Sequence, residues 1–187
     1  MKFDYKALIR LMKKSYKGGG IKIIRTEREL RDCFFLSGAG WALLIPKEKC
    51  PGQIVTWLAD LPRIGYAAWV VKGFDPKPLE PTERDLAIAD CTALTYNLGM
   101  KPLPLRTETE FLVQLGNFET AAFDLDAFAV VDGGANLGAF EPGVILARWT
   151  DEDTEAWFWI WNDITNVPEI ARTAASACRV WHTEKEN

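Results

Sequence analysis

A run of apolar residues near the end of the chain limits the possible folds more than any other feature. It reads Trp157-Phe158-Trp159-Ile160-Trp161. Successive side chains of a strand point to opposite faces, so the Trp residues would share one face while Phe158 and Ile160 share the other. A strand that is apolar on both faces is either covered on both sides or exposes one side to a partner.

The sequence leaves three interpretations of this strand open. It is a central strand of the core, or Trp157, Trp159 and Trp161 anchor a protein interface, or the Trp face stacks on nucleobases. Acidic residues on either side of the strand would repel phosphate, which disfavours the third interpretation. They are Asp151, Glu152, Asp153, Glu155 and Asp163.

The rest of the sequence is typical of a globular protein with mixed secondary structure. With 187 residues the chain is long enough to bury a substantial core, and 48% of its residues are hydrophobic while 26% are charged. Helical and extended patterns alternate along it. We therefore expect an α+β fold with an antiparallel sheet and helices packed on one face.

Local signals place the individual elements. Asp4 is a good N-cap for a helix that runs to about Tyr16 and ends at the glycines 18–20. A hairpin is expected from strands at 33–36 and 40–45. Further strands are expected at 21–25, 66–72, 106–115, 135–140, 144–149 and 156–161, and further helices at 51–61, 124–131 and 168–179. Segment 74–81 is typical of a stiff loop, and 82–97 fits either a helix from Thr82 or a strand.

The two ends of the chain resemble each other in the order of their elements. Phe3-Asp4-Tyr5 begins a helix followed by glycines and strands, and Phe123-Asp124-Leu125 begins the same succession. This indicates two pseudo-repeated halves, 1–75 and 105–187, joined by a linker and ambiguous segment at 76–104. The halves could also form a single compact domain.

Charge is divided unevenly along the chain. Residues 1–30 hold nine Lys and Arg against three Asp and Glu, whereas the whole chain has a net charge of −4. Five cations recur at spacings that place them together on one helix face, opposite an apolar stripe. They are Lys6, Arg10, Lys13, Lys14 and Lys17. The pattern favours either a solvated face or a surface that binds an anion, and phosphate backbones are the commonest partners of such stripes.

Several function classes find no support. The four Cys are scattered without metal-ligand spacing, and the only His, His182, lies near the C-terminus without a triad partner, so we expect no metal and no catalytic residues. The P-loop motif G-x-x-x-x-G-K-[ST] is absent, so P-loop chemistry is disfavoured, and we expect no cofactor. The N-terminus is not typical of a signal peptide and no apolar run could cross a bilayer, which predicts a cytoplasmic protein without a membrane partner. An enzyme is therefore disfavoured.

One glycine-rich segment resembles a known cofactor motif. Val130-Val131-Asp132-Gly133-Gly134-Ala135-Asn136-Leu137-Gly138 is similar to the first motif of S-adenosylmethionine-dependent methyltransferases. The resemblance implies that Asp132, Gly134 and Gly138 would approach the cofactor. It also implies a helix directly after the last glycine, which the following Pro142-Gly143 opposes. The alternative interpretation is a glycine-rich turn between a helix and a strand.

The arrangement of elements resembles a half-module of DNA polymerase sliding clamps and similar prophage-encoded proteins. The resemblance lies in a basic helix, a glycine break, strands and a late hairpin, 144–148 with 156–161. It implies that the five cations face nucleic acid and that a ring would require several copies of this short chain.

Together these observations predict a non-enzymatic accessory protein, clamp-like and oligomeric, that contacts the phosphate backbone of nucleic acid through its basic N-terminal helix. Two alternatives stay open. The protein could be an interaction module, such as a phage structural or inhibitory protein, that binds its partner through the Trp strand. It could also be a remnant of a methyltransferase.

Overall fold

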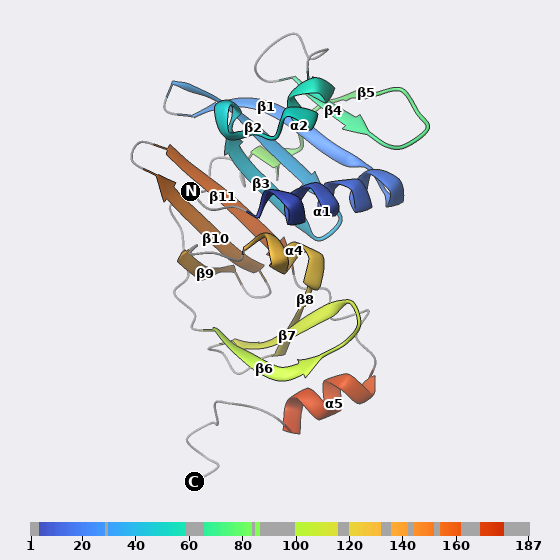
Figure 1. Ribbon diagram of the computed structural model, residues 1–187, viewed down its shortest axis with the longest axis vertical. Helices are drawn as coiled ribbons and strands as arrows, with labels where there is room; N and C mark the ends of the chain where they lie inside the picture. The colour runs from blue at the N-terminus through green and yellow to red at the C-terminus, as the bar shows by residue number, and fades with distance from the viewer. Residues whose placement is uncertain are drawn as a thin grey trace.

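The fold was obtained as a computed structural model (Figure 1). The structure describes residues 4–28, 30–58, 66–83, 85–86, 100–115, 120–131, 136–141, 144–151, 154–161 and 169–177. It confirms the expected α+β class with an antiparallel sheet. None of the described helices is both long and apolar enough to span a membrane.

The first helix, α1 (Tyr5–Gly18), follows from local chemistry. The carboxylate of Asp4 accepts hydrogen bonds from the backbone N–H groups of Lys6 and Ala7, both at 2.9 Å, and so caps the helix as expected. Its apolar stripe is buried, with Leu8 and Leu11 at 0% and 2% exposure. The helix therefore lies on the sheet through one side and presents the other side to solvent.

The strands that follow α1 form an antiparallel meander, β1-β2-β3, and two short strands, β4 and β5, at the edge of the same sheet. Strand β2 pairs with both β1 and β3, which confirms the expected hairpin and extends it in both directions. Strand β5 was not expected, because its segment reads as a Pro-rich loop; its short backbone nevertheless pairs with β4 at the edge of the sheet. The elements are β1 (Ile21–Arg28), β2 (Arg31–Gly38), β3 (Trp41–Pro46), the 3₁₀ helix η1 (Lys47–Lys49), α2 (Gly52–Leu58), β4 (Ala67–Val70) and β5 (Lys77–Leu79).

The second part of the chain forms a small sheet and a second meander. The elements are β6 (Met100–Arg106), β7 (Glu110–Leu115), β8 (Thr120–Asp124), α4 (Leu125–Val130), β9 (Asn136–Glu141), β10 (Val144–Asp151), β11 (Thr154–Trp161) and α5 (Glu169–Ala177). The strand expected at 106–115 is confirmed at 110–115 as β7, but Arg106 belongs to β6, so the segment is not a single strand. Thr107 and Thr109 donate hydroxyl hydrogen bonds to the Glu110 carboxylate, and this local turn separates β6 from β7.

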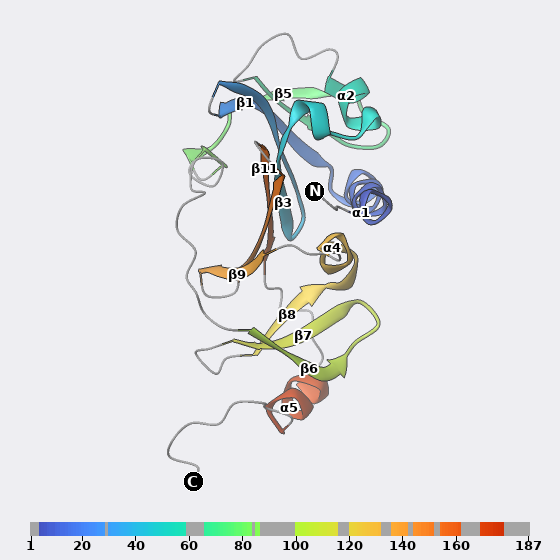
Figure 2. The ribbon, with the colours of Figure 1, turned by 60° about the vertical axis from the view of Figure 1, so that its left-hand side comes forward.

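Two sheets result, and the larger one contains strands from both parts of the chain. Its order is β5-β4-β1-β2-β3-β11-β10-β9, and every neighbouring pair is antiparallel. The small sheet has the order β6-β7-β8 and packs against α5. Figure 2 shows α1, α2 and α4 on one side of the large sheet. We call this side the helix-covered face and the opposite side the second face.

The meander β9-β10-β11 repeats the meander β1-β2-β3. The strand β2 starts at Arg31 and β10 at Val144, while β3 starts at Trp41 and β11 at Thr154, so both pairs of starts are 113 residues apart. Each meander follows a helix with an Asp N-cap, Asp4 in α1 and Asp124 in α4. The order β1-β2-β3-β11-β10-β9, with α1 and α4 in contact, is what a local twofold axis between β3 and β11 would generate.

The two faces of the large sheet carry separate hydrophobic clusters. The helix-covered face contains Trp41 and Phe158, whose stacked rings lie 6.0 Å apart, together with the buried sides of α1, α2 and α4. The second face contains Phe35, Trp157 and Trp159 among smaller residues such as Ala42. Since strand side chains alternate, β11 contributes to both clusters and is apolar on both faces for that reason.

Candidate functional site

Four of the five predicted cations share one exposed face of α1. Lys6, Arg10, Lys13 and Lys17 are all exposed, and within the described part of the chain none of them forms an ion pair. At 3.6 residues per turn they fall within an arc of about 60° and span about 16 Å along the helix axis. We call these four residues the basic face of α1.

Lys14 differs from the other four because its side chain faces the start of α4. Its Nζ lies 2.7 Å from Asp124 Oδ2 and 3.0 Å from Asp126 Oδ2 at the start of α4. Partial burial alone would lower the pKa of Lys14, but the hydrogen bonds from both carboxylates outweigh it and raise the pKa above its ordinary value. The expected grouping therefore holds for four cations, whereas Lys14 faces α4 and has its charge compensated inside the molecule.

The basic face continues at the C-terminal end of α1 through a residue that the sequence did not indicate. The backbone N–H of Lys72, which follows β4, donates a 2.9 Å hydrogen bond to the carbonyl of Tyr16. Lys72 is exposed. A residue this far along the chain could only be placed beside α1 by the tertiary fold.

The Trp strand is buried on both faces. Trp157 and Trp159 are 2% and 0% exposed, and Trp161 is partly buried against the same cluster. The guanidinium carbon of Arg28 lies 5.5 Å from the centroid of the Trp157 ring, which closes that end of the second face. The burial matches the core interpretation of this strand, and Trp157 and Trp159 cannot reach a partner unless the second face opens.

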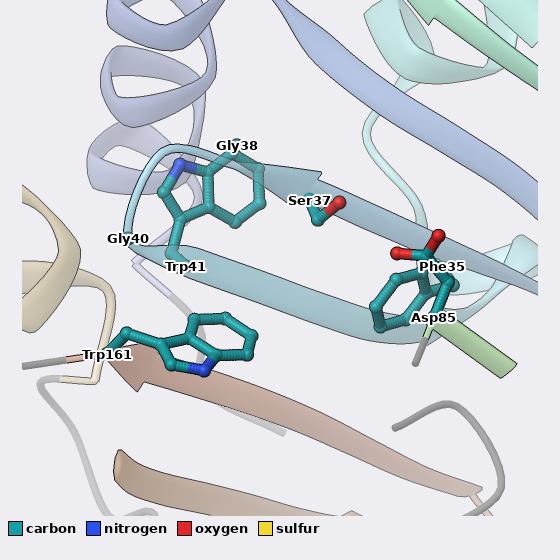
Figure 3. Close-up of a pocket in the computed structure, with 7 residues that line it drawn as sticks. All are labelled: Phe35, Ser37, Gly38, Gly40, Trp41, Asp85 and Trp161. Atoms are coloured by element: carbon teal, nitrogen blue, oxygen red, sulfur yellow. The ribbon is translucent and has the colours of Figure 1, made fainter. Parts of the chain in front are cut away.

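A pocket lies on the second face beside this strand (Figure 3). The sheet register explains why it is there: Lys22, Ser37, Ala42 and Trp159 are consecutive Cα partners across β1, β2, β3 and β11. Ser37 lines the pocket together with Gly38 and Gly40 at the turn into β3, and these small residues leave a hollow. Aromatic side chains stand around this hollow, because Phe35 and Trp161 line the pocket and Trp159 lies in edge contact with Phe35 at 6.3 Å.

Asp85 lines the same pocket from a helical turn that begins after Thr82, where the Leu86 N–H donates to the Thr82 carbonyl at 3.1 Å. Of the two interpretations of segment 82–97, the described residues 83, 85 and 86 follow the helix. Its Oδ2 accepts hydrogen bonds from Lys22 Nζ at 2.6 Å, from the Thr82 hydroxyl at 2.6 Å and from the Thr82 backbone N–H at 2.9 Å. Burial alone would raise the pKa of Asp85, but these hydrogen bonds together outweigh it and hold the pKa below its ordinary value. Asp85 is therefore ionised at neutral pH and its charge is balanced by Lys22.

Sequence reasoning did not identify Asp85, Lys22 or Ser37 as site residues. One local signal was available for the first: Thr82 and Asp85 have the spacing of a capping box, and the Asp85 backbone N–H does donate to the Thr82 hydroxyl at 3.2 Å. The contact between Asp85 and Lys22 joins residues 63 apart in sequence. No periodicity or motif could have indicated it.

The methyltransferase-like segment does not have the context that its resemblance implies. Gly138 lies in β9, which continues to Glu141 and pairs with β10, so a strand stands where the motif requires a helix. Asp132 and Gly134 lie outside the described residues. Strand β9 pairs with β10 at the edge of the large sheet, which matches the alternative of a strand after a glycine-rich segment.

The described cysteines and acidic groups offer little chemistry. Burial raises the pKa of the Cys50 thiol to about 12 and that of Cys33 to about 11, so both are protonated at neutral pH. Across the described ranges, no group of three or more His, Cys, Asp or Glu side chains could hold a metal ion.

The chain has no significant match among known protein families, curated proteins or solved structures.

Proposed function

We propose that this protein is a non-enzymatic accessory protein that binds the phosphate backbone of nucleic acid through the basic face of α1. The observation that carries the proposal is the presence of four exposed cations in one arc, without compensating carboxylates in the described structure, on a chain whose net charge is −4. Such a surface attracts a polyanion to one side while the acidic remainder repels it elsewhere. Contacts of this kind carry no sequence preference.

The electrostatic mechanism predicts a defined dependence on salt. Neutralising four phosphates releases counterions, so the logarithm of the binding constant should fall with the logarithm of salt concentration at a slope of about −3.6 for duplex DNA. The measurement is fluorescence anisotropy of a labelled duplex of random sequence between low and physiological salt.

Charge-removing substitutions on α1 offer a matched pair that tests the geometry. Lys13→Gln should weaken binding roughly tenfold near 50 mM salt and reduce the slope by about 0.9. Lys14→Gln removes the same charge from the next residue, but Asp124 and Asp126 already compensate it, so binding should change little. Equal binding by the wild type and by the fourfold variant Lys6→Gln, Arg10→Gln, Lys13→Gln, Lys17→Gln would refute the proposal.

The likeness to sliding clamps and the oligomer that a ring would need stay predictions. The cytoplasmic location of the protein also stays a prediction. Light scattering of the protein with and without duplex DNA measures the oligomeric state directly.

A further inference from the structure

The pocket on the second face has the size of a small ring compound. Its volume is about 280 Å³. Sites for drug-sized ligands occupy about 300–1,000 Å³, so this one suits a molecule of one or two rings. Figure 3 shows the Trp161 ring at one end and Phe35 with the Asp85 carboxylate at the other, with Ser37 between them. Flat aromatic walls favour a flat ligand.

Polar atoms without partners lie in and beside this pocket. The three hydrogen bonds to Asp85 all use Oδ2, and within the described structure Oδ1 has none. One carboxylate oxygen of Asp85 points toward Ser37 in Figure 3. Within the same described residues, the Ser37 hydroxyl has no hydrogen-bond partner either. The pocket thus offers an acceptor and a hydroxyl that can donate.

A third group next to the pocket is a fully buried donor. The Trp159 Nε1–H has no hydrogen-bond partner among the described residues, and the side chain is 0% exposed. Trp159 lies between two lining residues, since its ring contacts Phe35 and Trp161 follows two positions later on the same face of β11. Trp159 itself does not line the pocket, so its indole N–H is a reporter of events at the neighbouring Phe35 and Trp161 and not a contact for a ligand.

The charges of the pocket decide which ligand it suits. Lys22 Nζ at 2.6 Å compensates the Asp85 carboxylate, so neither a cation nor an anion is favoured. We propose that the pocket binds a small neutral planar heterocycle with a ring N–H donor next to a carbonyl acceptor, the chemistry of a nucleobase such as uracil. The Asp85 carboxylate accepts from the ring N–H, while Ser37 donates to the carbonyl and the ring lies between Phe35 and Trp161. The pocket shares no lining residue with the basic face of α1, and its proposed ligand does not depend on the proposed backbone contact.

The test follows indole N–H resonances of the full-length protein by NMR during titration with uracil. We expect the Trp159 and Trp161 indole signals to shift, with a dissociation constant of about 1 mM or tighter. 1,3-Dimethyluracil has the same ring without N–H donors and should bind at least tenfold more weakly. Absence of any shift at 10 mM uracil, or equal binding of the two compounds, would overturn the proposal.

Protein variants locate the site and a nucleotide identifies the source of the base. Ser37→Leu fills the hollow and should weaken uracil binding at least tenfold, whereas Thr26→Leu, on the second face but outside the pocket, should leave it unchanged. Equal binding by Ser37→Leu would place uracil elsewhere and reject the pocket. Tighter binding of uridine 5′-monophosphate than of uracil would support the pocket and indicate a nucleotide as its natural occupant, and weaker binding would support a free base.

Discussion

At the residue scale, single positions show where local sequence determines structure and where it does not. Gly20 ends α1 with a φ of +94°, a conformation that favours glycine and that the run of three glycines already indicated. The sequence did not indicate its neighbour: the Trp69 indole packs directly on Gly20 and donates a 3.1 Å hydrogen bond to the carbonyl of Gly19. Gly20 therefore has two roles: it ends α1, and it leaves room for the Trp69 indole to pack on the backbone.

Gly20→Ala should lower the free energy of unfolding by about 2–4 kcal/mol. A Cβ at this position would lie 2.3 Å from Trp69 Nε1, and the positive φ adds backbone strain. Gly18→Ala is the matched control, because a Cβ there meets nothing within 4 Å, and its effect should stay within about 0.5 kcal/mol or be stabilising. Urea denaturation followed by Trp fluorescence measures both. A similar loss for both variants would contradict the assigned role of Trp69.

At the element scale, the two Asp-capped helices show what local patterns can and cannot predict. Both N-caps could be predicted, because Asp4 and Asp124 precede apolar helical segments, and both make the expected bonds. The exposed side of α1 could be predicted as well. Its contact with α4 could not, since Lys14 meets Asp124 across 110 residues of chain. Strand β6 was missed altogether, because its two prolines, Pro102 and Pro104, are atypical of strands.

Removing the caps should have graded effects. Asp4→Ala should cost about 1 kcal/mol of unfolding free energy, while Asp4→Asn, which still caps the helix, should cost only a few tenths. Asp124→Ala should cost more than Asp4→Ala, because it removes a cap and one of the two carboxylates that bind Lys14. Chemical denaturation of the three variants tests this order. An Asp124→Ala variant as stable as the wild type would show that the junction of α1 and α4 contributes nothing.

At the scale of the whole molecule, pairing between distant segments determines the architecture. Strand β11 pairs with β3, which joins the two meanders into one sheet and buries the Trp strand on both faces. The sequence showed that this strand is apolar on both sides but left three interpretations open. The ion pair of Lys22 with Asp85 acts at the same scale, since it joins the helical turn that begins after Thr82 to β1.

This ion pair should make stability depend on pH in acid. The pKa of Asp85 is lower in the folded protein than in the unfolded chain, so its contribution is complete above the unfolded value near 3.8 and is lost as the pH falls through the folded value. Denaturation between pH 7 and pH 2.5 should show a smaller acid loss for Asp85→Asn than for the wild type. The exposed Asp75→Asn is the control and should follow the wild type. Parallel curves for all three proteins would contradict this role of Asp85.

The sequence by itself determined what depends on neighbouring residues: the α+β class, both capped helices, the hairpin of β2 and β3 and the cations on one side of α1. These features follow from periodicity, capping and turn chemistry, which act over a few residues. Only the tertiary structure decided which cation is compensated, that Trp157 and Trp159 are covered, and that small residues at the end of β2 leave a pocket beside Asp85. Each of these depends on residues far apart in the chain becoming neighbours across strands, and strand pairing leaves no local signal of its partner.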